Sequence, residues 1–230
     1  MKNYMIFLLA ILAACVLGCT PENETSLYNV HSTPKLVVLV YDITASTNAY
    51  TTLSEQNLND LFNSVAFDGG GTFAAITVKS NSKEQDVLTL CIPQVDTMNL
   101  AGNMYQRNER TDKNKEIKAK AATACQEFLS QTKTLVGQDK CERRSDVYTS
   151  LQLAKNETDF KLYADHAKYV IVVSDLLDNV NSSRSNNGCI DFGDAEVILV
   201  RPSEKQHIVT ANNVEIANSI SEAIRMLTLK

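Results

Sequence analysis

Three oxygen-bearing side chains directly follow an apolar run near the start of the chain. Asp42, Thr44 and Ser46 alternate at the end of "KLVVLVYDITAS", residues 35–46. A carboxylate and two hydroxyls, with no His or Cys beside them, suit a hard divalent cation such as Mg²⁺ or Mn²⁺. The same residue types are also good helix N-caps, so this segment alone leaves a capping role open.

A second carboxylate ends another apolar run. Asp175 closes "KYVIVVSD" at residues 168–175, and both runs are of the kind buried on both faces of a parallel sheet. Ligands bind at the carboxyl ends of such strands, so we expect Asp42 and Asp175 to share one rim if the strands are neighbours. Ser145, before "DVYTSLQLA", could supply a further hydroxyl.

For Asp178 a turn-capping role is predicted, and holding a metal-bound water is the alternative.

The elements that must position these residues alternate between strands and helices. This order predicts an α/β fold: a three-layer, doubly wound, mainly parallel sheet with one antiparallel strand. The glycines of "FDGGGT" punctuate the chain before a hairpin, and the segment 93–110 is predicted to be a loop. The expected helices are 47–65, 111–136, 146–155 and 215–227, and the expected strands are 35–42, 72–78, 86–92, 168–175 and 195–200.

These segments together resemble the von Willebrand factor A (vWA) domain family, whose fold is Rossmann-like. "DITAS" resembles that family's D-x-T-x-S motif, and "RRSDVYTSLQLA" is similar to its second loop, with Ser145 where the family has Thr. "YVIVVSDLLDN" resembles the strand that ends at the third-loop aspartate, here Asp175. The resemblance covers residues 35–230. One helix follows the strand 195–200, so the family's usual last strand is expected to be missing.

The resemblance implies a metal-ion-dependent adhesion site (MIDAS). A protein partner's carboxylate would fill an open coordination position of the Mg²⁺ or Mn²⁺ ion, and no reaction would be catalysed. The implied metal ligands, some acting through water, are Asp42, Thr44, Ser46, Ser145 and Asp175. A Ser in place of the Thr keeps the hydroxyl but loses the methyl that stiffens its rotamer.

The first nineteen residues, "MKNYMIFLLAILAACVLGC", are typical of a secretory leader. Their ending resembles the lipobox of bacterial lipoproteins, with Cys15 and Cys19 both candidates for the lipid. Lipidation of Cys19 leaves an even number of cysteines, which favours it in an oxidising compartment. We therefore expect a signal peptide at 1–18, a polar tether at 19–34 and a vWA-like domain at 35–230. The implied location is the bacterial cell envelope, with the chain lipid-anchored to a membrane and facing the periplasm or the surface.

Four cysteines would remain after the leader, and their spacing lacks the short pairs of a zinc site. Disulfides are expected, with three pairings open and Cys125–Cys141 favoured by the long helix and the loop that follows it. The four residues are Cys91, Cys125, Cys141 and Cys189. A eukaryotic secreted protein would instead offer Asn23, Asn156 and Asn181 for glycosylation.

Charge and motifs restrict the other function classes. Without Lys2 of the leader the chain has 21 basic and 27 acidic residues, a net charge of −6, which argues against a nucleic-acid partner. A phosphatase of haloacid-dehalogenase type is an alternative, but it needs a general acid where Thr44 stands. "DGGGT" lacks the lysine of a phosphate-binding loop. A structural envelope protein with an empty site is the remaining alternative.

Overall fold

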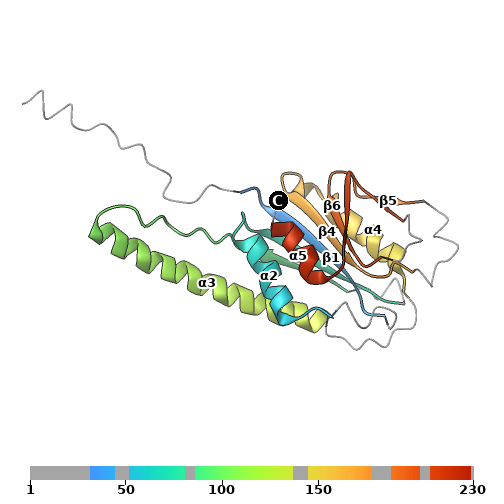
Figure 1. The fold of residues 1–230 in the computed structure, drawn as a ribbon, viewed down its shortest axis with the longest axis horizontal. Coiled ribbons are helices and arrows are strands. Elements are labelled where there is room, and N and C mark those ends of the chain that lie inside the picture. The colour runs from blue at the N-terminus through green and yellow to red at the C-terminus, as the bar shows by residue number, and fades with distance from the viewer. Residues whose placement is uncertain are drawn as a thin grey trace, which may run out of the picture.

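A mainly parallel sheet forms the centre of the molecule (Figure 1). The computed structural model describes residues 32–44, 52–80, 86–136, 145–177, 188–202 and 208–228. In this part of the chain six strands form the sheet in the order β3-β2-β1-β4-β6-β8, and neighbouring strands are parallel except for the antiparallel hairpin of β2 and β3. The strands are β1 (Lys35–Asp42), β2 (Gly71–Val78), β3 (Val87–Ile92), β4 (Ala167–Val173), β6 (Glu196–Val200) and β8 (Asn213–Ala217). The predicted fold class is confirmed.

Helices cover both faces of the sheet, which explains the unbroken apolar run of β1. Alternate β1 side chains point to opposite faces: Val37 and Leu39 join one core, and Leu36 and Val38 join the other. The first face carries α2 (Glu55–Ala66), α3 (Met104–Val136) and α5 (Ile220–Thr228). The second carries α4 (Val147–Thr158), the 3₁₀ turn η2 (Lys161–Tyr163) and a small parallel pair, β5 (Ile190–Asp191) with β7 (Val209–Thr210).

The end of the chain differs from the prediction. A single helix over 215–227 is wrong, because β8 lies parallel beside β6 and α5 begins only at Ile220. The last strand, which was expected to be missing, is therefore present as β8. Five residues are too few for strand alternation to stand out from helical spacing. The start of α5 is fixed by Ser219, whose Oγ accepts a hydrogen bond from the Glu222 backbone N–H at 3.2 Å.

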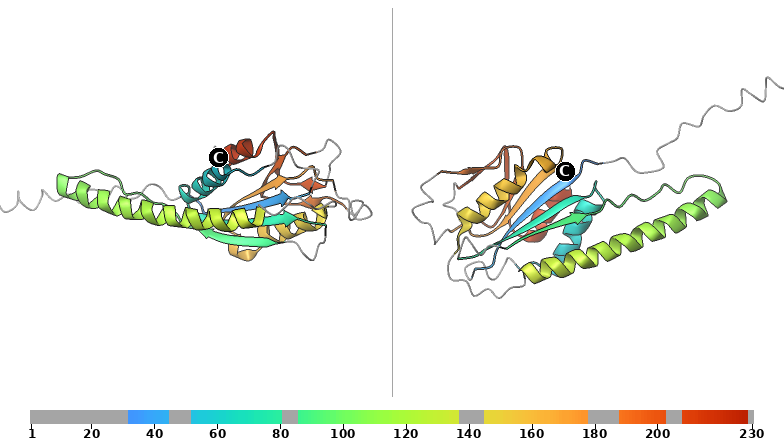
Figure 2. Two further views of the ribbon diagram at one scale, coloured as in Figure 1. Left: turned by 90° about the horizontal axis from the view of Figure 1, so that it is seen from below. Right: turned by 180° about the vertical axis from the view of Figure 1, so that it is seen from behind.

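The predicted start of the long helix is also wrong. Helix α3 begins at Met104 rather than 111, so part of the predicted loop 93–110 is helical. Asn103 and Gln106 each accept the other's backbone N–H with a side-chain oxygen, both at 3.0 Å, which starts the helix early. The first half of α3 extends past the end of the sheet (Figure 2). Within the described residues, no helix has both the length and the apolar character that a membrane span requires.

The described cysteines do not support the favoured disulfide. Cys91 and Cys125 are free thiols, and the Cys125 Sγ donates a hydrogen bond to Asn59 Oδ1 at 3.3 Å. The Cys125–Cys141 bond is thus not formed. Cys141 itself lies outside the described residues, as do Cys15, Cys19, Ser46 and Asp178.

Candidate functional site

The two aspartates of the predicted site follow neighbouring strands. β1 and β4 pair in parallel, with Tyr41 opposite Val173, so both strands end at the same rim. The chain leaves β1 through α2 to β2 on one side, while β4 lies on the other side. The strand order therefore reverses between β1 and β4, which is where open α/β sheets bind ligands. Asp42 ends β1 at this point, and Asp175 lies two residues after β4.

Asp42 is fully buried, with an exposed fraction of 0%. Its Oδ1 accepts the Thr44 backbone N–H at 2.8 Å, and its Oδ2 accepts the Ser174 hydroxyl at 2.8 Å. Burial raises the pKa of the Asp42 carboxyl, hydrogen bonds from Thr44 and Ser174 lower it, and the negative charge of Asp175 raises it further. The net pKa shift is upward, so the ionised form is costly at this position unless positive charge compensates it.

The segment 174–177 after β4 is held in a specific shape. The Ser174 Oγ accepts the Leu176 backbone N–H at 2.9 Å, and the Asp175 Oδ1 accepts the Leu177 backbone N–H at 2.9 Å. Leu176 has a φ of 60°, a left-handed conformation that is uncommon for a residue with a side chain. Its side chain is buried in the second core, which holds this conformation in place.

The loop before α4 contacts the same segment. Ser145 is buried, and its hydroxyl donates to the Leu177 carbonyl oxygen at 2.6 Å. The next residue, Asp146, is also buried and caps α4 by accepting the Thr149 backbone N–H at 3.1 Å. The Asp146 backbone N–H donates to the Lys79 carbonyl oxygen just beyond β2. Three separate loops therefore meet at this rim.

The structure brings four of the five predicted ligands to this rim. Asp42 and Thr44 are in direct contact, and Ser145 and Asp175 both bond the backbone of Leu177. Ser46, the fifth, lies outside the described residues.

Sequence reasoning missed two buried polar residues beside the predicted ligands. Ser174, directly before Asp175, holds the Asp42 carboxylate, and Asp146 follows Ser145. The sequence signal for Ser174 was a hydroxyl between an apolar strand and the aspartate that follows it. The sequence signal for Asp146 was its position as an N-cap residue directly before a helix.

The donor chemistry fits a hard cation. The side-chain donors are carboxylate and hydroxyl oxygens, and the buried Asp42 carboxyl would be favoured in its ionised form by a nearby positive charge. The described residues contain no group of three or more His, Cys, Asp or Glu side chains that could hold a metal. Any cation here would depend on hydroxyls, backbone oxygens, water or a partner to complete its shell. Thr44, which donates to Asp42, provides no general acid.

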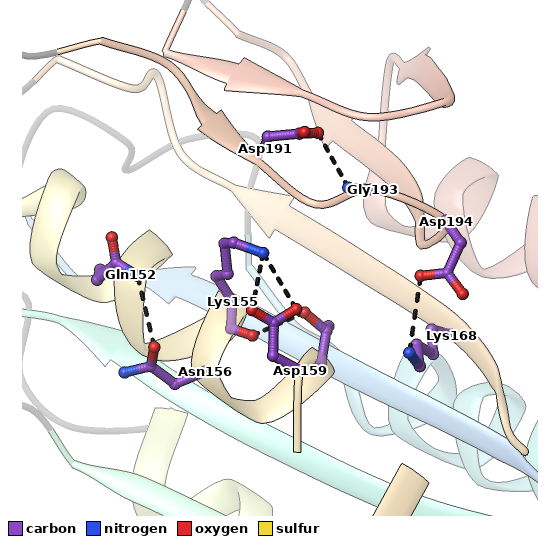
Figure 3. A network of polar contacts seen from close by, with 9 residues as sticks. Gln152, Lys155, Asn156, Asp159, Lys168, Asp191, Gly193 and Asp194 are labelled. Atoms are coloured by element: carbon purple, nitrogen blue, oxygen red, sulfur yellow. Dashed lines mark hydrogen bonds and ion pairs between the residues drawn. The ribbon is translucent and has the colours of Figure 1, made fainter. Parts of the chain in front are cut away.

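Other acidic residues on the α4 side are engaged in local contacts (Figure 3). Lys155 bonds Asp159 at 2.8 Å, and Lys168 lies 3.6 Å from Asp194. The Asp191 Oδ1 accepts the Gly193 backbone N–H at 3.0 Å. These pairs indicate a solvated surface rather than a second cation site.

No protein-family model and no curated protein matches this chain. Among solved structures it is similar to proximal thread matrix protein 1 from the mussel byssus, in two crystal forms. They have TM-scores of 0.41 and 0.40, identities of 15% and 14%, and coverage of 88% and 86% of this chain. The human COPII-coat protein Sec24c is similar with a TM-score of 0.37 and 9% identity over 87% of this chain. The match spans 48% and 47% of the mussel chains and 33% of Sec24c. Similarity at this level assigns neither a family nor a function.

Proposed function

We propose that this protein is a lipid-anchored envelope protein whose vWA-like domain binds a protein partner through Mg²⁺ or Mn²⁺, without catalysing a reaction. The observation that carries the proposal is Asp42: a fully buried carboxylate with a raised pKa, at the point where the strand order reverses. A carboxylate that is costly to ionise alone is stabilised when a cation binds beside it. The partner is expected to offer a carboxylate, and the anchor is expected at Cys19.

In this proposal each residue at the rim has a separate role. Thr44 and Ser174 orient the Asp42 carboxylate through its two oxygens. Asp175 adds negative charge at the same rim, and Ser145 fixes the Leu177 carbonyl beside it. A bound cation would supply a Lewis-acidic position for the partner's carboxylate. Because two carboxylates alone leave the coordination of Mg²⁺ incomplete, a partner's acid has a place to bind.

The test is a calorimetric titration of Mg²⁺ and Mn²⁺ into the chain that begins after Cys19. The Asp42→Asn variant is compared with the wild type because Asn keeps the shape and an acceptor oxygen but lacks the charge. We expect cation binding by the wild type and a loss of affinity of at least about tenfold in Asp42→Asn, since a direct charge contact is worth more than about 1.4 kcal/mol. Asp112→Asn, an exposed acid on α3, is the matched control and should bind like the wild type.

Thermal unfolding of both variants shows whether they are folded. Equal cation affinity in the wild type and a folded Asp42→Asn variant would contradict the proposed site. Absence of binding by the wild type, both alone and with a soluble acidic peptide added to supply a carboxylate, would favour a structural envelope protein.

A further inference from the structure

The first half of α3, with the loop that precedes it, stands clear of the sheet (Figure 2). We call residues 98–120 the α3 arm. Ile117 is the first α3 side chain that packs against the core, so Met104 to Glu116 have no support from the sheet. Thirteen helical residues extend about 20 Å. An isolated helix of this length has only marginal stability in water, so other contacts must stabilise this one.

The arm is held together by its own contacts. Asn114 accepts the Met98 backbone N–H at 2.8 Å and donates to the Met98 carbonyl at 3.0 Å, which ties the preceding loop along the helix. Arg110 donates to the carbonyl oxygens of Asn99 and Ala101. Together with the reciprocal cap of Asn103 and Gln106, these bonds hold the loop and the helix of the arm in one defined conformation.

The arm has the opposite charge to the rest of the chain. It contains six basic and three acidic residues, a net charge of +3, whereas the remainder after the leader has 15 basic and 24 acidic residues. Glu109 pairs with Lys113, and Asp112 pairs with Lys115. Arg107, Lys118 and Lys120 are exposed and form no ion pair with any described residue, so their charge faces solvent.

Exposed apolar side chains gather at the same end of the molecule. Of the ten large apolar side chains exposed in the described residues, three lie at the arm's tip: Leu100, Met104 and Tyr105, with exposed fractions of 50%, 80% and 79%. Three others lie at the end of the sheet where β1 starts. Phe67 precedes the turn that bonds the Lys35 backbone, and Phe160 and Leu162 precede β4, whose first N–H bonds the Pro34 carbonyl.

The predicted tether joins the fold at this end of the sheet too. Ser32 and Pro34 directly precede β1, and Ser32 hydrogen-bonds Asp68 next to the turn after α2. Thirteen residue steps separate Cys19 from Ser32, and an unfolded chain of that length without glycine would span about 20 Å or more. The arm is therefore about as long as the expected distance between the lipid and the sheet. A domain anchored at Cys19 would have the arm's tip within reach of the membrane surface.

We propose that the α3 arm rests on the anionic lipid bilayer to which the chain is anchored. Arg107, Lys118 and Lys120 attract the lipid headgroups, and Tyr105 and Met104 enter the interfacial region. The proposal rests on the proposed lipid anchor at Cys19 and is independent of the cation site. With the arm's tip on the membrane and the start of β1 facing it, the domain turns the opposite rim, where Asp42 lies, away from the lipid and toward a partner.

The test uses tryptophan fluorescence, because the chain contains no Trp. Tyr105→Trp, in the chain that begins after Cys19, is mixed with vesicles of phosphatidylglycerol and phosphatidylcholine. We expect a blue shift of the emission, quenching by brominated lipid, reversal by high salt and a much weaker response to pure phosphatidylcholine. Adding R107E, K118E and K120E should lower vesicle affinity at least about tenfold, because each cation near an anionic surface contributes about fivefold.

Three controls test the specificity of this interface. The triple variant R107K, K118R and K120R keeps the charge and should bind like the parent. Val87→Trp reports from the opposite end of the sheet, on a side chain that is 45% exposed, and should show no blue shift. Asp42→Asn should leave vesicle binding unchanged, which distinguishes failure of this interface from failure of the cation site.

Three results would overturn the proposal: no response of Tyr105→Trp to anionic vesicles, an equal response to neutral vesicles, or an equal response from Val87→Trp. Salt-sensitive self-association of the chain in sedimentation, without vesicle binding, would instead assign the arm to a second copy of the protein.

Discussion

At the scale of single residues, Asp42 combines two properties that rarely occur together. Its side chain has no exposure to solvent, yet it lies at the rim of the sheet where ligands bind. Its hydrogen bonds from Thr44 and Ser174 offset only part of the cost of burying a charge, because the net pKa shift is still upward. The residue is therefore a destabilising feature of the cation-free fold, of the kind that functional sites retain.

The cost of burying the ionised Asp42 carboxylate makes the stability of the fold depend on pH, and the sign of this dependence is defined. The pKa of Asp42 in the folded state lies above its unfolded value of 3.8, so its contribution to stability is fully present below about pH 4. The contribution is lost as pH rises through the folded-state pKa. We expect the cation-free wild type to lose stability over this window relative to Asp42→Asn, measured as melting temperature against pH. Parallel curves for the two proteins would contradict the raised pKa.

Ser174 is the residue that positions the Asp42 carboxylate in the proposed cation site. Ser174→Ala removes the hydroxyl that donates to Asp42 Oδ2 and accepts from the Leu176 N–H. We expect a loss of unfolding free energy of about 1.5–3 kcal/mol, typical of a hydrogen bond to a charged group, and weaker Mg²⁺ binding in calorimetry. Ser174→Thr keeps the hydroxyl and should retain most of both. If Ser174→Ala lowered stability but left Mg²⁺ affinity unchanged, the residue would be structural only.

The limit of sequence reasoning is visible at these residues. Asp42 and Asp175 could be predicted because their type and their position after apolar strands are both local features. The bonds of Ser174 and Ser145 could not, since they depend on the backbone of 174–177, including the left-handed Leu176. Local sequence does not specify that conformation for a leucine, and it is held by burial of the side chain in the core.

At the scale of elements, the pairing of β1 with β2 requires Gly71. A Cβ on Gly71 would lie 1.9 Å from the Lys35 carbonyl oxygen, and the residue has a φ of 140°. Lys35 cannot move away, because its buried ammonium group bonds Asp68 at 2.6 Å and the Leu227 carbonyl at 3.2 Å. The start of β1 is thus fixed to the turn after α2 and to the end of α5.

Gly71→Ala should therefore destabilise the protein strongly. We expect a loss of about 3 kcal/mol or more in unfolding free energy, since both overpacking and backbone strain contribute, and a fall in melting temperature of about 6 °C or more. Gly193→Ala is the matched control: its φ of 59° is also positive, but no atom lies within 4 Å of the added Cβ. It should cost only about 1 kcal/mol. Equal losses in the two variants would show that the contact with Lys35 is relieved.

Element prediction worked where the signal was long and failed where it was short or non-local. The buried strands β1 and β4, the β2–β3 hairpin and α4 follow from their apolar patterns. The strand β8 has five residues and gains its place from pairing with β6, which no local pattern records. The early start of α3 depends on the reciprocal cap of Asn103 with Gln106 and on the bonds of Asn114 to a preceding loop whose composition is that of an irregular segment.

At the scale of the whole molecule, stability is expected to be uneven along α3. Its second half packs Phe128 against Phe62 and Phe73 in the core, with ring centroids 5.6 and 5.0 Å apart. Its first half is held by the loop contacts alone, so local opening there breaks few buried contacts. Native-state hydrogen exchange should show a gradient along one continuous helix, with strong protection near Phe128 and weak protection from Met104 to Glu116.

The loop contacts can be tested by the same measurement. Asn114→Ala removes both hydrogen bonds to Met98, and at about 1 kcal/mol per bond it should speed amide exchange in the arm by about tenfold or more, with no change near Phe128. Thr134→Ala, which removes an exposed hydroxyl bond to the Ser130 carbonyl outside the arm, is the control and should leave the arm unaffected. Uniform exchange along α3, or an unchanged arm in Asn114→Ala, would mean that the helix needs no loop to hold it. Anionic vesicles should slow exchange in the arm of the wild type, because a membrane that binds the arm also stabilises it.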